Sequence, residues 1–113
     1  MSCRISYLPE FERELKRHAK RYRSMKDDYA SLLKQIKDNP AAGIDMGDGI
    51  RKIRMAITAK GKGKSGGARV ITYNVVTKVK DNEVVLVTIY NKAEVSSISK
   101  RDIVSRLRSN GLI

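Results

Sequence analysis

Cysteine and histidine are almost absent from this chain of 113 residues, where they occur once each, as Cys3 and His18. One cysteine cannot form an internal disulfide bond, and such sparing use is typical of a reducing compartment. The pair also cannot supply the four ligands of a usual zinc site, so we expect no metal and no cofactor. Nucleophilic catalysis by Cys-His or Ser-His-Asp groups finds no support either, because a lone helical histidine is usually structural.

Long apolar runs are missing as well. The first ten residues contain nothing like the apolar region of a signal peptide, and no segment approaches the ~20 apolar residues that span a bilayer. We therefore expect a cytoplasmic protein with no membrane partner. The length predicts a single domain over residues 1–113, large enough to bury one core.

Acidic residues are absent from the middle of the chain, between Asp48 and Asp81, although nine basic residues fall there and the formal net charge is +12. This scarcity argues against paired catalytic carboxylates of the glycosidase type. A block of uncompensated cations predicts a binding surface for a polyanion, with a generic solubilising surface as the alternative. The nine are Arg51, Lys52, Arg54, Lys60, Lys62, Lys64, Arg69, Lys78 and Lys80.

Hydrophobic spacing predicts an α+β fold in the order β-α-α-β-β-β-α. We expect strands at 5–7, 50–57, 70–79 and 84–91. A first helix should begin at Pro9, a second should follow Ser24 and stop at Asn39-Pro40, and a last one should follow Ser99 and end at Gly111. Residues 37–49 should form mainly a loop. The sheet should be four-stranded and mainly antiparallel, with two helices packed on one face.

Three details of the helices can also be predicted. The apolar stripe of the first helix should consist of Phe11, Leu15, Ala19 and Tyr22. Ser24 should cap the second helix in a capping box with Asp27, and Ser99 should cap the last helix with Asp102.

A glycine-rich basic turn, residues 59–73, separates two of the expected strands and contains four glycines, three lysines and one arginine. Its Gly63-Lys64-Ser65 is similar to the end of a nucleotide-binding P-loop. However, Thr58 stands where that motif needs a glycine, and a strand follows instead of a helix. A flexible hairpin would explain the glycines but not the charge around them.

Alternation along the strands predicts that cations share one face of the sheet. Lys52 and Arg54 project from the side opposite to Ile53 and Met55. Gly66-Gly67 could host a bulge, so the sequence does not fix which of Arg69 and Val70 points inward. If the parities of the neighbouring strands agree, the cluster on one concave surface is Lys52, Arg54, Arg69, Tyr90 and Lys92. Such a cluster can bind RNA or DNA. It can also promote attack of a ribose 2′-OH on its own phosphate, which needs mostly alignment and charge stabilisation.

Residues 63–73, Gly-Lys-Ser-Gly-Gly-Ala-Arg-Val-Ile-Thr-Tyr, resemble the signature of RelE/HigB-type toxins of bacterial toxin–antitoxin pairs. Phe11 with the basic first helix, Asn39-Pro40, Lys52-Ile53-Arg54 and the segment 89–94 follow in the order that this family shows. The resemblance therefore covers nearly the whole chain. The sequence has no aromatic residue after Tyr90, and in this respect it is closer to the HigB branch.

The resemblance implies a RelE-like microbial RNase fold, ribosome-dependent cleavage of mRNA by 2′-OH attack, inhibition of growth, and neutralisation by a cognate acidic antitoxin. By similarity, Arg69 corresponds to the family's phosphate-contacting arginine, Lys52 and Arg54 to its basic pair, and Lys92 to a basic position after the last strand. We expect catalysis from Arg69, Lys52, Arg54, Lys92 and Tyr90. We expect RNA or ribosome binding from Lys60, Lys62, Lys64, Arg51, Lys78, Arg17, Lys20 and Arg21.

Two other functions stay open from the sequence. One is a ParE-like toxin, of the same fold, that binds DNA gyrase without cutting RNA. The other is a small basic nucleic-acid-binding protein with no lethal activity, whose variants would change affinity and salt dependence but not growth.

Overall fold

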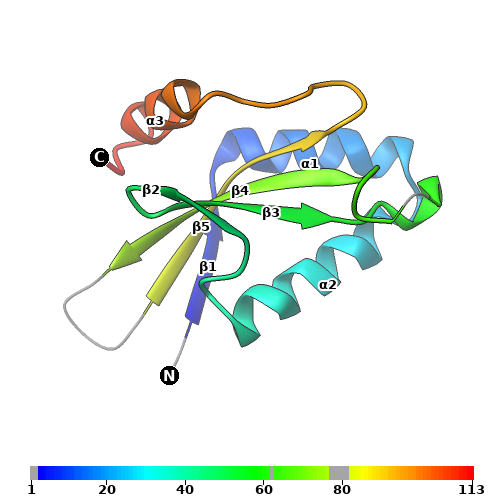
Figure 1. Ribbon diagram of the computed structural model, residues 1–113, viewed down its shortest axis with the longest axis horizontal. Helices are drawn as coiled ribbons and strands as arrows, with labels where there is room; N and C mark the ends of the chain where they lie inside the picture. The colour runs from blue at the N-terminus through cyan, green and yellow to red at the C-terminus, as the bar shows by residue number, and fades with distance from the viewer. Residues whose placement is uncertain (1–2, 62, 77–81) are drawn as a thin grey trace.

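The computed structural model of the chain shows helices packed around a five-stranded sheet (Figure 1). It describes residues 3–61, 63–76 and 82–113. The elements are β1 (Cys3–Tyr7), α1 (Pro9–Arg21), α2 (Met25–Asp38), β2 (Ile44–Gly47), β3 (Ile50–Met55), a 3-10 turn (Thr58–Lys60), β4 (Ala68–Val76), β5 (Asn82–Asn91) and α3 (Lys100–Ser109). The predicted α+β class is confirmed. Within the described residues no helix is long and apolar enough to cross a membrane.

The sheet is mixed, with the strand order β1-β5-β4-β3-β2. β1 runs parallel to β5, and the other three neighbouring pairs are antiparallel. The strands that the sequence places on either side of the basic turn, β3 and β4, are therefore direct neighbours, and β5 lies beside β4.

β2 is the strand that we did not predict, because it lies inside the segment interpreted as a loop. Its pairing with β3 joins Gly47 to Ile50, so only Asp48 and Gly49 form the turn between the two strands. Both have positive φ values, 56° and 79°, as the two-residue turns favoured in hairpins require. The glycines of this segment thus close a hairpin rather than mark an irregular loop, and the sheet has five strands instead of four.

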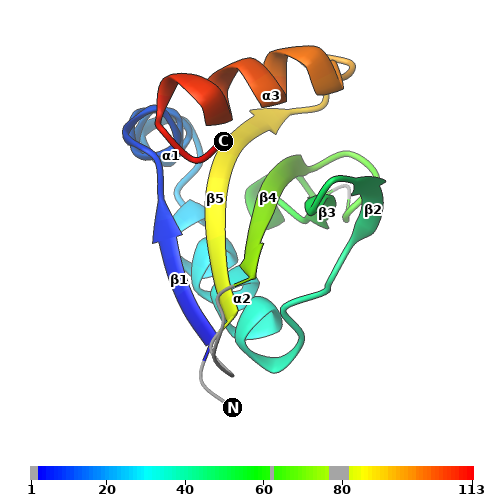
Figure 2. The same cartoon turned by 90° about the vertical axis from the view of Figure 1, so that its left-hand side faces the viewer.

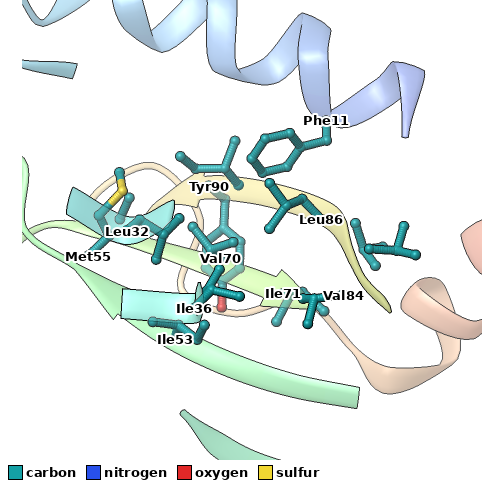
Figure 3. Close-up of a cluster of buried hydrophobic side chains, with 14 of the residues drawn as sticks. Phe11, Leu32, Ile36, Ile53, Met55, Val70, Ile71, Val84, Leu86 and Tyr90 are labelled. Carbon is teal, nitrogen blue, oxygen red and sulfur yellow. The ribbon is translucent and has the colours of Figure 1, made fainter. Parts of the chain in front are cut away.

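The helices α1 and α2 pack together on one face of the sheet. The rings of Phe11 in α1 and Tyr29 in α2 have centroids 6.1 Å apart. Figure 3 shows Leu32 and Ile36 of α2 beside Ile53 of β3 in the core, where each of these three side chains is at most 2% exposed. This arrangement is the predicted one, with two helices on one face.

The third helix, α3, lies on the other side of the sheet from α2 (Figures 1 and 2). The predicted cap is confirmed, because the Ser99 hydroxyl accepts a hydrogen bond of 3.1 Å from the backbone N–H of Asp102. Ile103 and Leu107 are buried, each 1% exposed. The sheet therefore has helices on both faces. The face that carries α3 is open only where this helix does not extend over the strands.

Side chains rather than a strand cover part of one edge of the sheet. In the described register β1 pairs with β5 only up to Leu86, which leaves the following residues of β5 without a neighbour on that side. Glu14 of α1 accepts a hydrogen bond of 3.3 Å from the backbone N–H of Ile89, and Arg106 of α3 donates one of 3.1 Å to the carbonyl of Val87. The two side chains also form an ion pair at 3.2 Å.

The buried face of α1 differs by one residue from the predicted stripe. Ala19 is exposed, whereas His18 is only 2% exposed. The stripe was wrong at this position because α1 faces the edge of β5 as well as the core, and this edge can bind polar side chains. Burial lowers the pKa of His18 below its ordinary value of 6.5, so the imidazole is neutral at pH 7.

Candidate nucleic-acid interface

Three of the predicted catalytic residues form a row across the central strands. Arg54 of β3 pairs directly with Arg69 of β4, and Arg69 pairs directly with Tyr90 of β5. Directly paired residues lie on the same face, with Cβ atoms about 4.5–5.5 Å apart. Lys52 lies two residues before Arg54 on β3, so it shares that face, which is opposite to α2. The structure thus brings four of the five predicted catalytic residues to one surface.

The fifth, Lys92, follows the end of β5 and is held close to the row through its backbone. Its N–H donates a hydrogen bond of 3.2 Å to the carbonyl of Gly67, two residues before Arg69. Gly67 itself has no room for a side chain, because a Cβ there would lie 2.2 Å from the carbonyl oxygen of Met55. This glycine therefore permits the close approach of β3, the basic turn and the residue after β5.

The buried guanidinium of Arg69, a residue 7% exposed, links the row to the glycine-rich turn. Its Nη1 donates to the carbonyls of Lys64 at 2.9 Å and Ala68 at 3.2 Å, and its Nη2 donates to Ser65 at 3.5 Å. A guanidinium carries five N–H groups. Among the described residues these bonds use three of them and hold the turn in place, and the other two N–H groups form no hydrogen bond there.

Tyr90 is the neutral member of the row. It is 4% exposed, and burial raises the pKa of its hydroxyl above the ordinary value of 10, whereas the nearby charge of Arg69 acts in the opposite direction. The hydroxyl is therefore protonated at neutral pH, and it can donate a hydrogen bond to an anion.

A buried carboxylate on α2 anchors the start of the basic turn. Asp28, 8% exposed, accepts hydrogen bonds from the backbone N–H of Thr58 at 2.9 Å, from the Thr58 hydroxyl, and from Ser24 Oγ at 2.8 Å. Ser24 Oγ in turn accepts from the N–H of Ala59 at 2.8 Å. Ser24 precedes α2 as predicted, but the predicted capping box with Asp27 is wrong, because its hydroxyl serves the turn instead of the helix.

Four cations around the row have no side-chain partner among residues 3–61, 63–76 and 82–113. Within the part of the chain that the structure describes, no side-chain hydrogen bond or ion pair involves Lys52, Arg54, Lys64 or Lys92. A cation that is already paired must lose its partner before it can bind an anion. These four side chains have no such partner to lose among the described residues. Their charges add to the one that Arg69 supplies.

Two of the predicted binding residues support the fold. Arg51 donates to the carbonyl of Ala41 at 2.9 Å and lies 3.9 Å from the carboxylate of Asp45. Lys60 donates to the side-chain oxygen of Asn91 at 3.0 Å. Both side chains are thus engaged in tying loops to strands.

The predicted cations of α1 lie away from the row. Arg17 and Lys20 are exposed on the helix, whereas Arg21 forms an ion pair with Glu94 and lies over the ring of Tyr22, 5.4 Å from its centroid. The remaining two predicted residues, Lys62 and Lys78, lie outside the described residues.

The role of Asp28 was not predictable from the sequence. Its partner Thr58 is thirty residues away, and an acidic residue in the first turn of a helix is common for reasons of the helix dipole alone. The row itself was predicted only on the condition that neighbouring strands agree in parity, and the register of β3, β4 and β5 supplies that agreement for Arg54, Arg69 and Tyr90.

One comparison with known proteins bears on this site. The family described as RelE toxin of the RelE / RelB toxin-antitoxin system matches residues 11–109. The match includes strands β2 to β5 and therefore every member of the row.

Proposed function

The chain belongs to the RelE family of toxins of toxin–antitoxin systems, and from that membership we propose that it is a ribosome-dependent endoribonuclease that cuts mRNA and so inhibits translation and growth. The family implies an antitoxin as partner. With a net charge of +12 on the toxin, an acidic antitoxin is the partner that electrostatic attraction favours.

The observation that supports cleavage is the row Arg54–Arg69–Tyr90 with Lys52 on the same face. Arginine can form two parallel hydrogen bonds with a phosphate, and Tyr90 offers a further donor. A phosphodiester seated on this row would meet several fixed donors at one point. Such donors stabilise the charge that develops on a phosphate during in-line displacement.

The proposed reaction uses the ribose of the message as its own nucleophile. The 2′ oxygen forms a bond to phosphorus as its proton passes to water, and the bond between phosphorus and the 5′ oxygen breaks as that oxygen takes a proton from water. The products are a 2′,3′-cyclic phosphate and a free 5′-hydroxyl. Lys52 and Arg54 attract the phosphate, Arg69 holds it with its two remaining N–H groups, and Tyr90 donates to a non-bridging oxygen. Removing one such donor typically lowers the rate by about 10²–10³.

The row alone does not supply everything that cleavage needs, and this favours dependence on the ribosome. The row supplies charge and donors, but in-line attack also needs the 2′ oxygen, the phosphorus and the leaving oxygen in one line. Alignment of this kind contributes about 7–11 kcal/mol to intramolecular reactions. We propose that the ribosome supplies it in the cytoplasm, with Lys64, Arg17 and Lys20 contacting RNA.

The test is induced expression of wild type and of an Arg54→Ala variant, with mapping of message 5′ ends. Arg54 is exposed and makes no side-chain contact with a partner among the described residues, so this variant should fold normally and cut at least about a hundredfold more slowly. Arg108→Ala changes another exposed arginine, on α3; it is the matched control and should arrest growth like the wild type. Growth arrest with intact messages and poisoned DNA gyrase would overturn the nuclease and favour the ParE-like activity.

A further inference from the structure

A groove runs along the edge of β3, between α2 and the glycine-rich turn. β2 pairs with β3 only over residues 50–52 of the described chain, so the following residues of β3 have an edge that no strand covers. α2 runs alongside β3 there (Figure 1). Two adjoining hollows occupy this place, and both are lined by Gln35, Arg54 and Lys64.

The groove begins at the row of Arg54, Arg69 and Tyr90 and continues around the edge of the sheet. Arg54 belongs to the row and also lines both hollows. Lys52, its neighbour on the same face, lines the hollow nearer to β2, together with Ile44. A chain held at Arg54 can therefore pass into the groove without leaving the cationic surface.

The lining combines positive charge, one amide and an apolar surface. Lys52, Arg54 and Lys64 supply three cations without partners among the described residues. Ile44 is 58% exposed at the groove and offers an apolar surface there. The one carboxylate, Asp28, is only 8% exposed and already accepts three hydrogen bonds, so it does not oppose an anion strongly.

We propose that this groove is a nucleotide subsite for the message, and that Gln35 is a residue that selects the base. The nucleotide next to the phosphate on the row would place its base against Ile44, while Lys64 contacts the following phosphate. The amide of Gln35 carries both donors and an acceptor, and it can therefore form two hydrogen bonds with the edge of a base. The proposal rests on the proposed nuclease function and specifies its substrate contacts.

Single-stranded RNA fits this lining better than an extended peptide does. A peptide added to the edge of β3 would be held through main-chain hydrogen bonds, and it would not require the cations Lys52, Arg54 and Lys64 in the lining. RNA alternates phosphates with flat apolar bases that carry polar edges, and the groove alternates cations with Ile44 and Gln35.

The experiment measures kcat/KM for cleavage on ribosomes programmed with each A-site codon in turn. Gln35→Glu removes the amide donors and adds a negative charge, and Ile44→Ser removes the apolar surface. Each has a matched control. Asn39→Asp makes the same chemical change at an exposed residue whose side-chain oxygen accepts from Ala41 N, a bond that aspartate retains. Ile113→Ser changes another isoleucine that is more than half exposed.

We expect Gln35→Glu to lower kcat/KM by about tenfold and to change the ranking of the codons. Ile44→Ser should lower kcat/KM for all codons alike, by about tenfold, while both controls stay within about twofold of wild type. The subsite is overturned if the two groove variants cut at wild-type rates with wild-type codon preference. It is also overturned if they cut normally but escape neutralisation by the antitoxin, because the groove would then bind a peptide.

Failure of the nuclease itself gives a different result. If wild type cuts no message on any programmed ribosome, the proposed function is wrong and the subsite falls with it. If wild type cuts and only the groove variants fail to differ from their controls, the nuclease stands and the subsite alone is wrong.

Discussion

Replacing Arg69 by alanine should damage both stability and activity, because the guanidinium is a buried structural link as well as a proposed phosphate ligand. The change removes hydrogen bonds of 2.9, 3.2 and 3.5 Å to backbone carbonyls. Bonds to a charged group contribute about 1.5–3 kcal/mol each, the longest far less, and the relieved desolvation of the buried charge offsets part of the loss. We therefore expect the free energy of unfolding to fall by about 2–4 kcal/mol.

A domain of this size has roughly 5–15 kcal/mol of stability, so the variant should remain folded at 25 °C. Its cleavage rate should fall further than stability alone explains, by about 10²–10³. Urea unfolding followed by circular dichroism gives the first quantity, and message cleavage on programmed ribosomes gives the second. Arg54→Ala separates the two effects, because it should lose cleavage without losing stability. Wild-type cleavage by folded Arg69→Ala would refute a role for this arginine at the phosphate.

Three further substitutions test individual features of the fold. Burial lowers the pKa of His18 in the folded protein, so the unfolded chain binds a proton at a higher pH and the free energy of unfolding should fall as the pH drops below about 6.5. His18→Gln should remove this part of the pH dependence, as urea midpoints at pH 7.5 and 5 would show. Asp28→Ala leaves the backbone N–H of Thr58 without its acceptor and should lower the free energy of unfolding by about 1–3 kcal/mol, whereas exposed Asp27→Ala should change little in the same urea titration. Gly67→Ala places a Cβ 2.2 Å from the carbonyl oxygen of the neighbouring strand and should cost about 1–3 kcal/mol. Gly61→Ala, which meets no atom within 4 Å, should cost only the strain of its positive φ, about 1–2 kcal/mol by thermal unfolding.

The row of Arg54, Arg69 and Tyr90 could be predicted only in part. Side chains alternate along a strand, and the glycine-rich turn favours β3 and β4 as antiparallel neighbours. The register stayed open, because a bulge at Gly66-Gly67 would have exchanged the directions of Arg69 and Val70. The structure supplies that register, in which Arg54 pairs with Arg69.

The features that escaped prediction depend on contacts between distant segments. Ser24 stands where a helix cap is expected, but its hydroxyl forms hydrogen bonds with Asp28 and with the backbone N–H of Ala59 instead. Ala19 continues an apolar spacing, yet α1 packs against a polar strand edge that favours His18. Gln35 belongs to no motif, and only the fold places it beside Arg54.

The backbone of β5 depends on a side chain from the last helix, α3. The carbonyl of Val87 is satisfied by Arg106, which the chain supplies nineteen residues later. Until that helix is present, β5 offers bare backbone to any other strand, the situation that leads to aggregation. A product that stops short of α3 would therefore expose this backbone and be prone to aggregation.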